Sequence, residues 1–231
     1  MSLRVLLLTG GYEGHERPVH YGQLAEIFAG EAGADLRITR DLAVLTPESL
    51  REYHVIVNWS TFVWPTEQQV AALIGAVEGG VGFLGIHGAT ATFWNSELYM
   101  RFVGSTFQSH PPIKTFRVEI ADRAHPITAG VDDFDVEDER YVLGGSPEEF
   151  AEMARLSIEG RDRAQVRSTS KAPLDPSLHV LARSEGQPLL YIKETGRGRL
   201  HYNALGHDER SLGHPAVRRL LIQGLRWVNR E

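Results

Sequence analysis

The 231-residue sequence predicts an α/β fold of the doubly wound type, with a mainly parallel sheet. Residues 4–10 form a continuous apolar run without alternation, which is typical of a strand buried on both faces. Residues 65–80 carry apolar side chains at helical spacing and lead directly into a second apolar run at 81–86. Strand and helix patterns alternate in this way through the first part of the chain, as parallel strands with crossover helices require.

Local signals mark the ends of the predicted elements. The segment after the first strand favours a helix, because Pro18 suits its first turn and Gly33 suits its C-terminal cap. Thr66 and Gln69 have capping-box spacing at the start of the helix that precedes the second apolar run. The remaining strands of this part are expected at 35–40 and 54–59.

The C-terminal half is predicted to contain more strands than helices. Residues 114–121 and 135–145 alternate as strands do. Three later segments indicate a meander, at 179–184, 188–194 and 198–206. An amphipathic helix closes the chain after His214. Residues 151–177 are rich in Arg, Ser, Lys and Pro and predict a loop insertion in a single domain that covers residues 1–231.

Composition excludes several classes of function. The chain has no cysteine, so disulfides, cysteine nucleophiles, thiolate zinc sites and iron–sulfur clusters are excluded. The formal net charge is −6 and no Lys/Arg-rich run occurs, so we expect no nucleic-acid partner. No stretch is long and apolar enough for a membrane span, and the N-terminus lacks the features of a signal peptide. We therefore expect a cytoplasmic protein without a membrane partner.

Three histidines follow predicted strands: His15, His87 and His207. Ligands of open α/β sheets bind outside the carboxyl ends of the strands, so the three imidazoles are expected to meet in one crevice. Histidine-rich sites without cysteine suit a divalent metal, zinc or a similar first-row ion, and these three are the candidate ligands. His110 lies in a later loop and is a candidate for contacting the substrate.

His87 occupies a predicted strand-to-helix elbow between Gly85 and Gly88, where glycine relieves crowding in a tight turn. The positive end of the following helix should disfavour imidazolium and keep the ring neutral. A neutral imidazole serves as a metal ligand or a general base. The alternative for any one of these histidines is a purely structural role.

Carboxylates and aromatic rings complete the predicted site. Within a strand, Glu137, Glu139 and Tyr141 should share one face and Asp138 the opposite face. Two more carboxylates follow His207 in sequence, Asp208 and Glu209. Several aromatic residues follow strand ends and either pack in the core or form a stacking platform for a sugar; they are Trp59, Phe62, Trp64, Phe93, Trp94 and Phe107.

These motifs resemble those of ThuA-like (trehalose-utilisation) proteins, which belong to the class I glutamine amidotransferase-like superfamily. The resemblance covers nearly the whole chain and is carried, in order, by LLLTGGYEGHE, WPTEQQVAALIGAVEGGVGFLGIHGATATF, FVGSTFQSHPP, HPITAGVDDFDVEDERYVL and GRGRLHYNALGHDERSLGHPAVRRLLIQGLRW. It implies a flavodoxin-like three-layer sandwich with a mainly parallel central sheet, and a context of sugar metabolism. It indicates no nucleotide cofactor.

The resemblance also places His87 where the amidotransferases have their catalytic cysteine. His207 and Glu209 then match the histidine and glutamate of those enzymes. Because the elbow carries no cysteine, hydrolysis of glutamine through a thioester is excluded.

The sequence thus predicts an enzyme that acts on a disaccharide or an oxidised sugar, as a hydrolase, isomerase or lyase. The catalytic candidates are His87, His207, Asp208, Glu209 and Glu139. The substrate-binding candidates are Trp59, His110, Tyr141 and Trp94. Two alternatives remain, a non-catalytic carbohydrate-binding or regulatory module and a subunit that acts only within a complex. The predicted insertion could supply a contact between subunits in a homo-oligomer.

Overall fold

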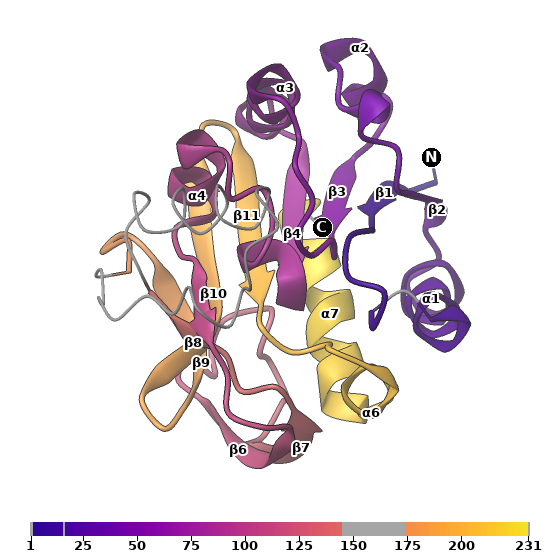
Figure 1. Cartoon of the computed structure of the whole chain (residues 1–231). Coiled ribbons are helices and arrows are strands. Elements are labelled where there is room, and N and C mark those ends of the chain that lie inside the picture. Colours follow the sequence, from indigo (N-terminus) through magenta and orange to yellow (C-terminus); the bar gives the residue numbers. More distant parts are fainter. Residues whose placement is uncertain (1, 16, 145–173, 231) are drawn as a thin grey trace.

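The computed structural model describes residues 2–15, 17–144 and 174–230. Its centre is a nine-stranded sheet in the order β2-β1-β3-β4-β11-β10-β9-β6-β7 (Figure 1). The strands of this sheet are β1 (Arg4–Leu8), β2 (Asp35–Thr39), β3 (Val55–Asn58), β4 (Gly82–Ile86), β6 (Lys114–Ile120), β7 (Phe134–Asp138), β9 (His179–Ser184), β10 (Gln187–Thr195) and β11 (Gly198–Asn203). A separate two-stranded sheet pairs β5 (Phe107–Ser109) with β8 (Val142–Leu143).

The large sheet is mixed. Strands β2, β1, β3, β4 and β11 pair in parallel, and the pairs from β11 to β7 are antiparallel. The predicted α/β class is therefore confirmed, and parallel pairing is limited to one half of the sheet. The predicted meander forms as β9, β10 and β11. Its hairpins are too short to hold a crossover, so these strands must run antiparallel. The first hairpin turns at Glu185 and Gly186, which both have positive φ.

Helices cover both faces of the parallel half. They are α1 (Pro18–Ala25), which continues as the π-helical turn η1 (Glu26–Glu31), α2 (Pro47–Leu50), α3 (Glu67–Glu78), α4 (Glu97–Val103), α6 (Glu209–Leu212) and α7 (Pro215–Val228), with 3₁₀ turns η2 (Leu42–Val44) and η3 (His87–Thr90). The predicted capping box of Thr66 and Gln69 is present at α3. In β11, Gly198 faces Val77 of α3 and His201 faces Gly224 of α7, so these two helices lie on opposite faces.

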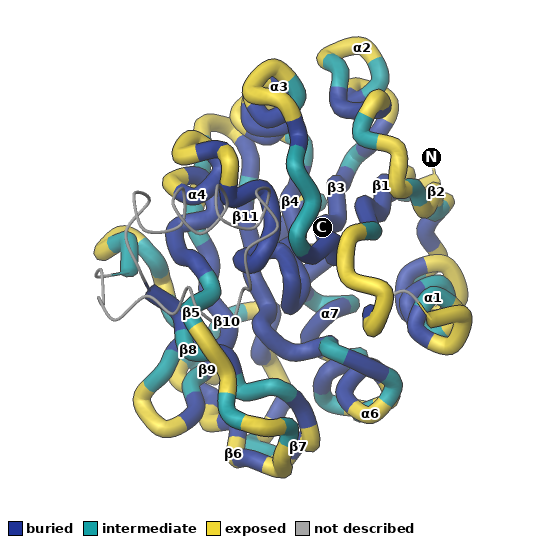
Figure 2. Tube along the Cα trace, viewed as in Figure 1, coloured by how far each residue is buried: buried dark blue, intermediate teal, exposed yellow. Residues whose placement is uncertain are grey.

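The core fills the space between the sheet and its helices. All residues of β3 and β4 are buried, as Figure 2 shows for the central strands. Burial on both faces explains why these segments are apolar throughout instead of alternating. Among the described residues, no helix has the length and apolarity that a membrane crossing requires.

Three predicted elements differ in detail. The segment after His87 is the short turn η3, and the next α-helix begins only at Glu97. The single strand predicted over 135–145 is two strands in different sheets, because pairing with β6 ends at Asp138. Most of the loop insertion predicted at 151–177 lies outside the described residues; residues 174–178, which are described, form a loop.

The close approach of α7 to β11 leads to a stability prediction. A Cβ added at Gly224 would lie 2.5 Å from Cδ2 of the buried His201 ring, whereas a Cβ added at Gly75 of α3 would meet no atom within 4 Å. Gly224→Ala should therefore destabilise the fold by about 1–3 kcal/mol through overpacking. Gly75→Ala should stabilise it by about 0.5–1 kcal/mol through helix propensity. Urea unfolding of both variants checks the two signs, and equal effects would contradict the packing described here.

Candidate metal centre

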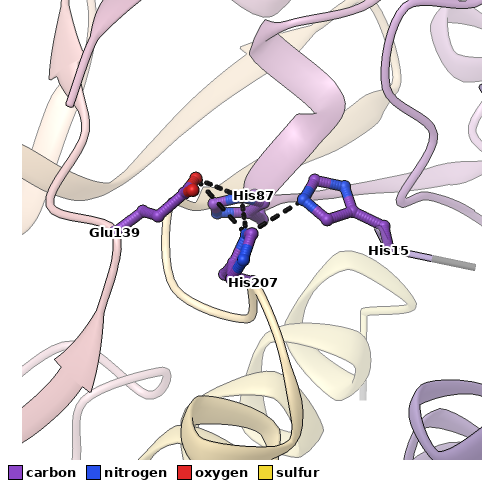
Figure 3. Close-up of side chains that lie close together, drawn as sticks. All are labelled: His15, His87, Glu139 and His207. Carbon is purple, nitrogen blue, oxygen red and sulfur yellow. Dashed lines mark hydrogen bonds and ion pairs between the residues drawn. The ribbon is translucent and has the colours of Figure 1, made fainter. Parts of the chain in front are cut away.

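Four side chains from distant parts of the sequence meet at the carboxyl end of the parallel strands. They are His15, His87, Glu139 and His207, and Figure 3 shows them pointing toward one another. One ligand atom from each lies within 4.8 Å of the others. His87 directly follows β4, His15 and His207 lie in loops after β1 and β11, and Glu139 follows β7. The predicted convergence of the three histidines is thus confirmed, and Glu139 joins them.

The spacing of these atoms suits one metal ion. His207 Nδ1 lies 2.9 Å from His15 Nε2, 3.3 Å from His87 Nε2 and 3.3 Å from Glu139 Oε2. His87 Nε2 lies 3.3 Å from Glu139 Oε2. In a tetrahedral zinc site with bonds of about 2.0–2.1 Å, neighbouring ligand atoms are roughly 3.3–3.4 Å apart. Three of these four separations agree with that geometry.

The proton positions also favour a cation at the centre. His87 Nδ1 lies 2.9 Å from the carbonyl oxygen of Ala204, which can only accept, so Nδ1 donates and Nε2 of the neutral ring has a lone pair. That lone pair faces the Glu139 carboxylate, which is also an acceptor. The Tyr141 hydroxyl, 2.8 Å from Nε2, donates to that lone pair in the protein alone, and a metal ion would fit between the two acceptors.

A strained turn directs His87 into the cluster. Its φ is 43°, which is unusual for a residue other than glycine. Two buried hydroxyls support the turn, because Tyr202 donates to the His87 carbonyl at 2.9 Å and lies 2.8 Å from the Thr90 hydroxyl. A Cβ at Gly88 would lie 2.0 Å from Thr61 Oγ1, so only glycine fits there. The expected effect of a helix N-terminus on His87 does not apply, since η3 is a single short turn; the Ala204 carbonyl sets the tautomer instead.

Burial and mutual contacts change the pKa values of the cluster. Burial would raise the pKa of Glu139, but its contacts with His207 and His87 outweigh it and hold that pKa well below its usual range. Burial would lower the pKa of His207, but the bond and charge of Glu139 outweigh it and raise that pKa. Burial, with the nearby His87 and His207, lowers the pKa of His15 to about 2. Without a metal, these pKa shifts favour an ion pair between His207 and Glu139 beside a neutral His15.

Two further candidates adjoin the cluster. Tyr141 is buried, and its hydroxyl lies 2.8 Å from His87 Nε2 with the two rings 4.2 Å apart. His110 is exposed, and its Nε2 lies 3.4 Å from Glu139 Oε1, whereas Oε2 of the same carboxylate contacts His87 and His207. Both side chains therefore lie where they can contact a molecule bound at the cluster.

The carboxylates after His207 take other partners. Glu209 bonds to His20 Nε2 at 2.8 Å and pairs with Arg17, so it lies away from His207. Asp208 caps α6, bonds to Arg210 and approaches His207 Nε2 only to 4.0 Å. The carboxylate in contact with His207 is thus Glu139 and not the Glu209 that the resemblance suggests. Glu137 lies on the exposed face of β7, and because the strand ends at Asp138, Glu139 does not share that face as expected.

The two tryptophans named as candidates are buried near the cluster. Trp59 is 1% exposed, and its Nε1 donates to the carbonyl of Gly206. Its ring lies 5.8 Å from that of His15, so it supports the cluster from within the core. Trp94 is 4% exposed and donates to the carbonyl of Thr90. It packs with Met100 and the partly buried Phe62, Trp64 and Phe107 in a small apolar cluster.

Two residues that support the site were not among the sequence candidates. His20 Nδ1 lies 2.7 Å from the His15 carbonyl, and its Nε2 bonds to Glu209. Thr61 Oγ1 lies 2.9 Å from His15 Nδ1. Both orient His15, and in the sequence only the short separation of His15 from His20 hinted at a connection.

A family model identifies the family of this chain, and solved structures share its fold. The sequence model of the ThuA family, described as Trehalose utilisation, matches residues 4–228. Solved structures of ThuA-like proteins from Parabacteroides merdae and Bacteroides uniformis share 16% and 20% identity with the chain, with TM-scores of 0.76 and 0.72. They cover 99% and 98% of this chain and 90% and 91% of their own. At such identity the likeness in structure shows the fold alone.

A third similar structure is a cytoplasmic protein from Salmonella typhimurium, with 12% identity and a TM-score of 0.65. The match covers 97% of this chain and 99% of that one. No curated protein matched the sequence.

The ion pair between His207 and Glu139 can be tested in the metal-free protein. Glu139→Gln should lower the pKa of His207, because the carboxylate raises that pKa and burial alone lowers it. NMR titration of the imidazole signals measures the change. Glu137→Gln, two residues away and exposed, should leave the His207 titration unchanged. An unaltered His207 pKa in Glu139→Gln would show that the two side chains are not in contact.

Proposed function

The chain belongs to the ThuA (trehalose utilisation) family, and from this membership and the geometry of the cluster we propose a metal-dependent enzyme of carbohydrate metabolism. The substrate class is a disaccharide or an oxidised sugar. The single observation that supports an enzyme best is the convergence of three histidines and a carboxylate around one point. The class of reaction is hydrolysis, isomerisation or elimination, and glutamine hydrolysis is excluded by the missing cysteine.

The donor set indicates the class of metal. Nitrogen from three imidazoles with one carboxylate oxygen suits zinc or a similar divalent first-row ion. The protein already fixes the ligands, because His87 is anchored by Ala204 and His15 by Thr61. Bound there, such an ion would supply Lewis-acid polarisation of a carbonyl or activation of water, provided that substrate or water joins or replaces one of the four protein ligands. Three His and one Glu leave the bound ion a charge near +1, which favours an electron-rich oxygen of the substrate.

The surrounding side chains supply the other parts of the proposed site. The side chains of His207 and Glu139 are 14% and 12% exposed, so the cluster is mostly enclosed and reaches solvent only at these two residues. His110 and Tyr141 are placed to hydrogen-bond a bound sugar, and Asp208 lies near the same edge. We assign His87, His207 and Glu139 to holding the metal ion; the alternative for the same three residues is acid–base catalysis without a metal. Glu209 hydrogen-bonds to His20. Trp59 and Trp94 donate to the backbone carbonyls of Gly206 and Thr90, in the segments that carry His207 and His87.

A non-catalytic carbohydrate-binding or regulatory module is the second candidate. The observation that favours it is the loss of the nucleophile at the elbow, where His87 stands. The buried ion pair argues for the enzyme, because a module that only stacks on sugar rings gains nothing from a costly buried carboxylate.

The remaining properties follow from family and fold. We propose one domain over residues 1–231, with the parallel half as a flavodoxin-like three-layer sandwich. We propose a cytoplasmic location, which the similar cytoplasmic protein from Salmonella typhimurium supports. The expected binding partner is a small sugar. The proposed function is compatible with a homo-oligomer. Nucleic acid and membrane are not expected.

Metal content tests the proposed function directly. Protein purified without a histidine tag should contain about one divalent ion per chain, measured by plasma mass spectrometry. His87→Ala should lose it and lose turnover of the sugar substrate. His179→Ala is the matched control, because His179 is exposed and pairs with Asp122. A metal-free wild type whose sugar binding is unaffected by His87→Ala would favour the module.

Metal affinity should depend on pH through His207. Its pKa is raised in the metal-free protein, and a ligand nitrogen must lose its proton before it binds metal. Below that pKa, the affinity for Co²⁺ should fall about tenfold for each unit of pH, and above it the affinity should level off. Calorimetric titrations from about pH 5 to about pH 9 measure this. A flat profile would mean that His207 is not a ligand.

A further inference from the structure

Asp138 is a buried carboxylate that touches none of the ligand atoms, yet it lies beside the cluster. Its side chain is enclosed by protein, and the residue is 1% exposed. Burial raises its pKa, against the opposing effects of His87, Ser211 and two backbone amides. A carboxylate in such a place is costly, and the stability of the fold alone does not call for one.

Its hydrogen bonds connect two distant segments. Asp138 Oδ1 accepts from the backbone N–H of Glu139 at 2.8 Å, and Oδ2 accepts from the backbone N–H of Gly206 at 2.9 Å. Glu139 is a cluster residue, and Gly206 immediately precedes the cluster residue His207. The two bonds therefore fasten the end of β7 to the loop after β11, across 68 positions of sequence.

Neighbouring groups make this connection rigid. The Ser211 hydroxyl bonds to Asp138 and also accepts from the Gly206 N–H at 3.1 Å. The Gly206 carbonyl accepts from Trp59 Nε1 on its other side. Gly206 itself has a φ of 114°, a conformation that only glycine adopts readily. The peptide that carries His207 is thus held from two directions.

We infer that Asp138 is a positioning residue, which sets Glu139 and His207 at the separation that a shared metal ion requires. This inference rests on the proposed function for its metal, while the positioning itself concerns only the protein. Groups that orient metal ligands without touching the metal are worth about 10–100-fold in metal affinity.

The test uses Asp138→Asn, which keeps the size of the side chain but replaces one acceptor with a donor facing an N–H group. Co²⁺ should bind about 10–100-fold more weakly to this variant, and its visible absorption spectrum should change. In crystals of the metal-free variant, Glu139 Oε2 and His207 Nδ1 should lie farther apart than the 3.3 Å of the wild type.

The matched control is Asp133→Asn. Asp133 also accepts from a backbone N–H of another strand, that of Ile120 at 2.8 Å, but it lies outside the cluster. The Asp133→Asn variant should be less stable than the wild type, but its affinity for Co²⁺ and the visible absorption spectrum of its Co²⁺ complex should be unchanged. If Asp138→Asn does not fold, Ser211→Ala should produce a smaller change in the same direction, because it removes one of the bonds to the same carboxylate.

The outcomes separate the two ideas. If wild-type protein binds no Co²⁺, the proposed function fails, and the metal-free crystal structures still decide the role of Asp138. If Asp138→Asn, or Ser211→Ala in its place, keeps the wild-type separation of Glu139 and His207, the positioning role is overturned. If the wild type binds Co²⁺ and the variant binds it with the same affinity and the same visible spectrum, the positioning role of Asp138 is also overturned.

Discussion

The site depends on one electrostatic constraint, a largely buried carboxylate that lies against the ring nitrogens of two imidazoles. Glu139 lies 3.3 Å from both His87 Nε2 and His207 Nδ1. An imidazole nitrogen with a lone pair repels the carboxylate, whereas a proton or a metal ion between the two groups turns the repulsion into attraction. The anchors around the cluster hold the acceptors in place against that repulsion, since His87 is held by a backbone carbonyl and His15 by a hydroxyl. The arrangement is therefore organised before any ligand arrives.

The mixed sheet explains how this arrangement forms. The parallel half places His15, His87 and His207 at one edge, because the carboxyl ends of parallel strands lie on the same side. The antiparallel half supplies the carboxylate, since β7 lies at the far end of the strand order and still contacts α6, the helix that follows His207. The parallel half of the sheet thus supplies the three histidines, and the antiparallel half supplies the carboxylate of Glu139.

The parallel half and its three histidines could be predicted from the sequence, because burial on both faces and a polar residue after a strand leave local signals. The pairing of Glu139 with His207 could not, since it depends on β7 ending at Asp138 and on the path of the sheet. Sequence adjacency pointed to Glu209, but in the structure α6 begins there and directs that side chain to His20. Contacts between distant segments leave no periodicity to detect.

The anchor of His87 has a consequence for how this site can change over evolution. The ring is oriented by the carbonyl oxygen of Ala204, an atom that every amino acid carries. Replacing the side chain at position 204 leaves that acceptor in place, provided that the chain keeps its path. Selection on His87 thus places no demand on the identity of the residue whose carbonyl orients its ring. Sequences of related proteins can diverge at this position while the imidazole keeps its direction, so a search for covarying side chains would overlook the pair.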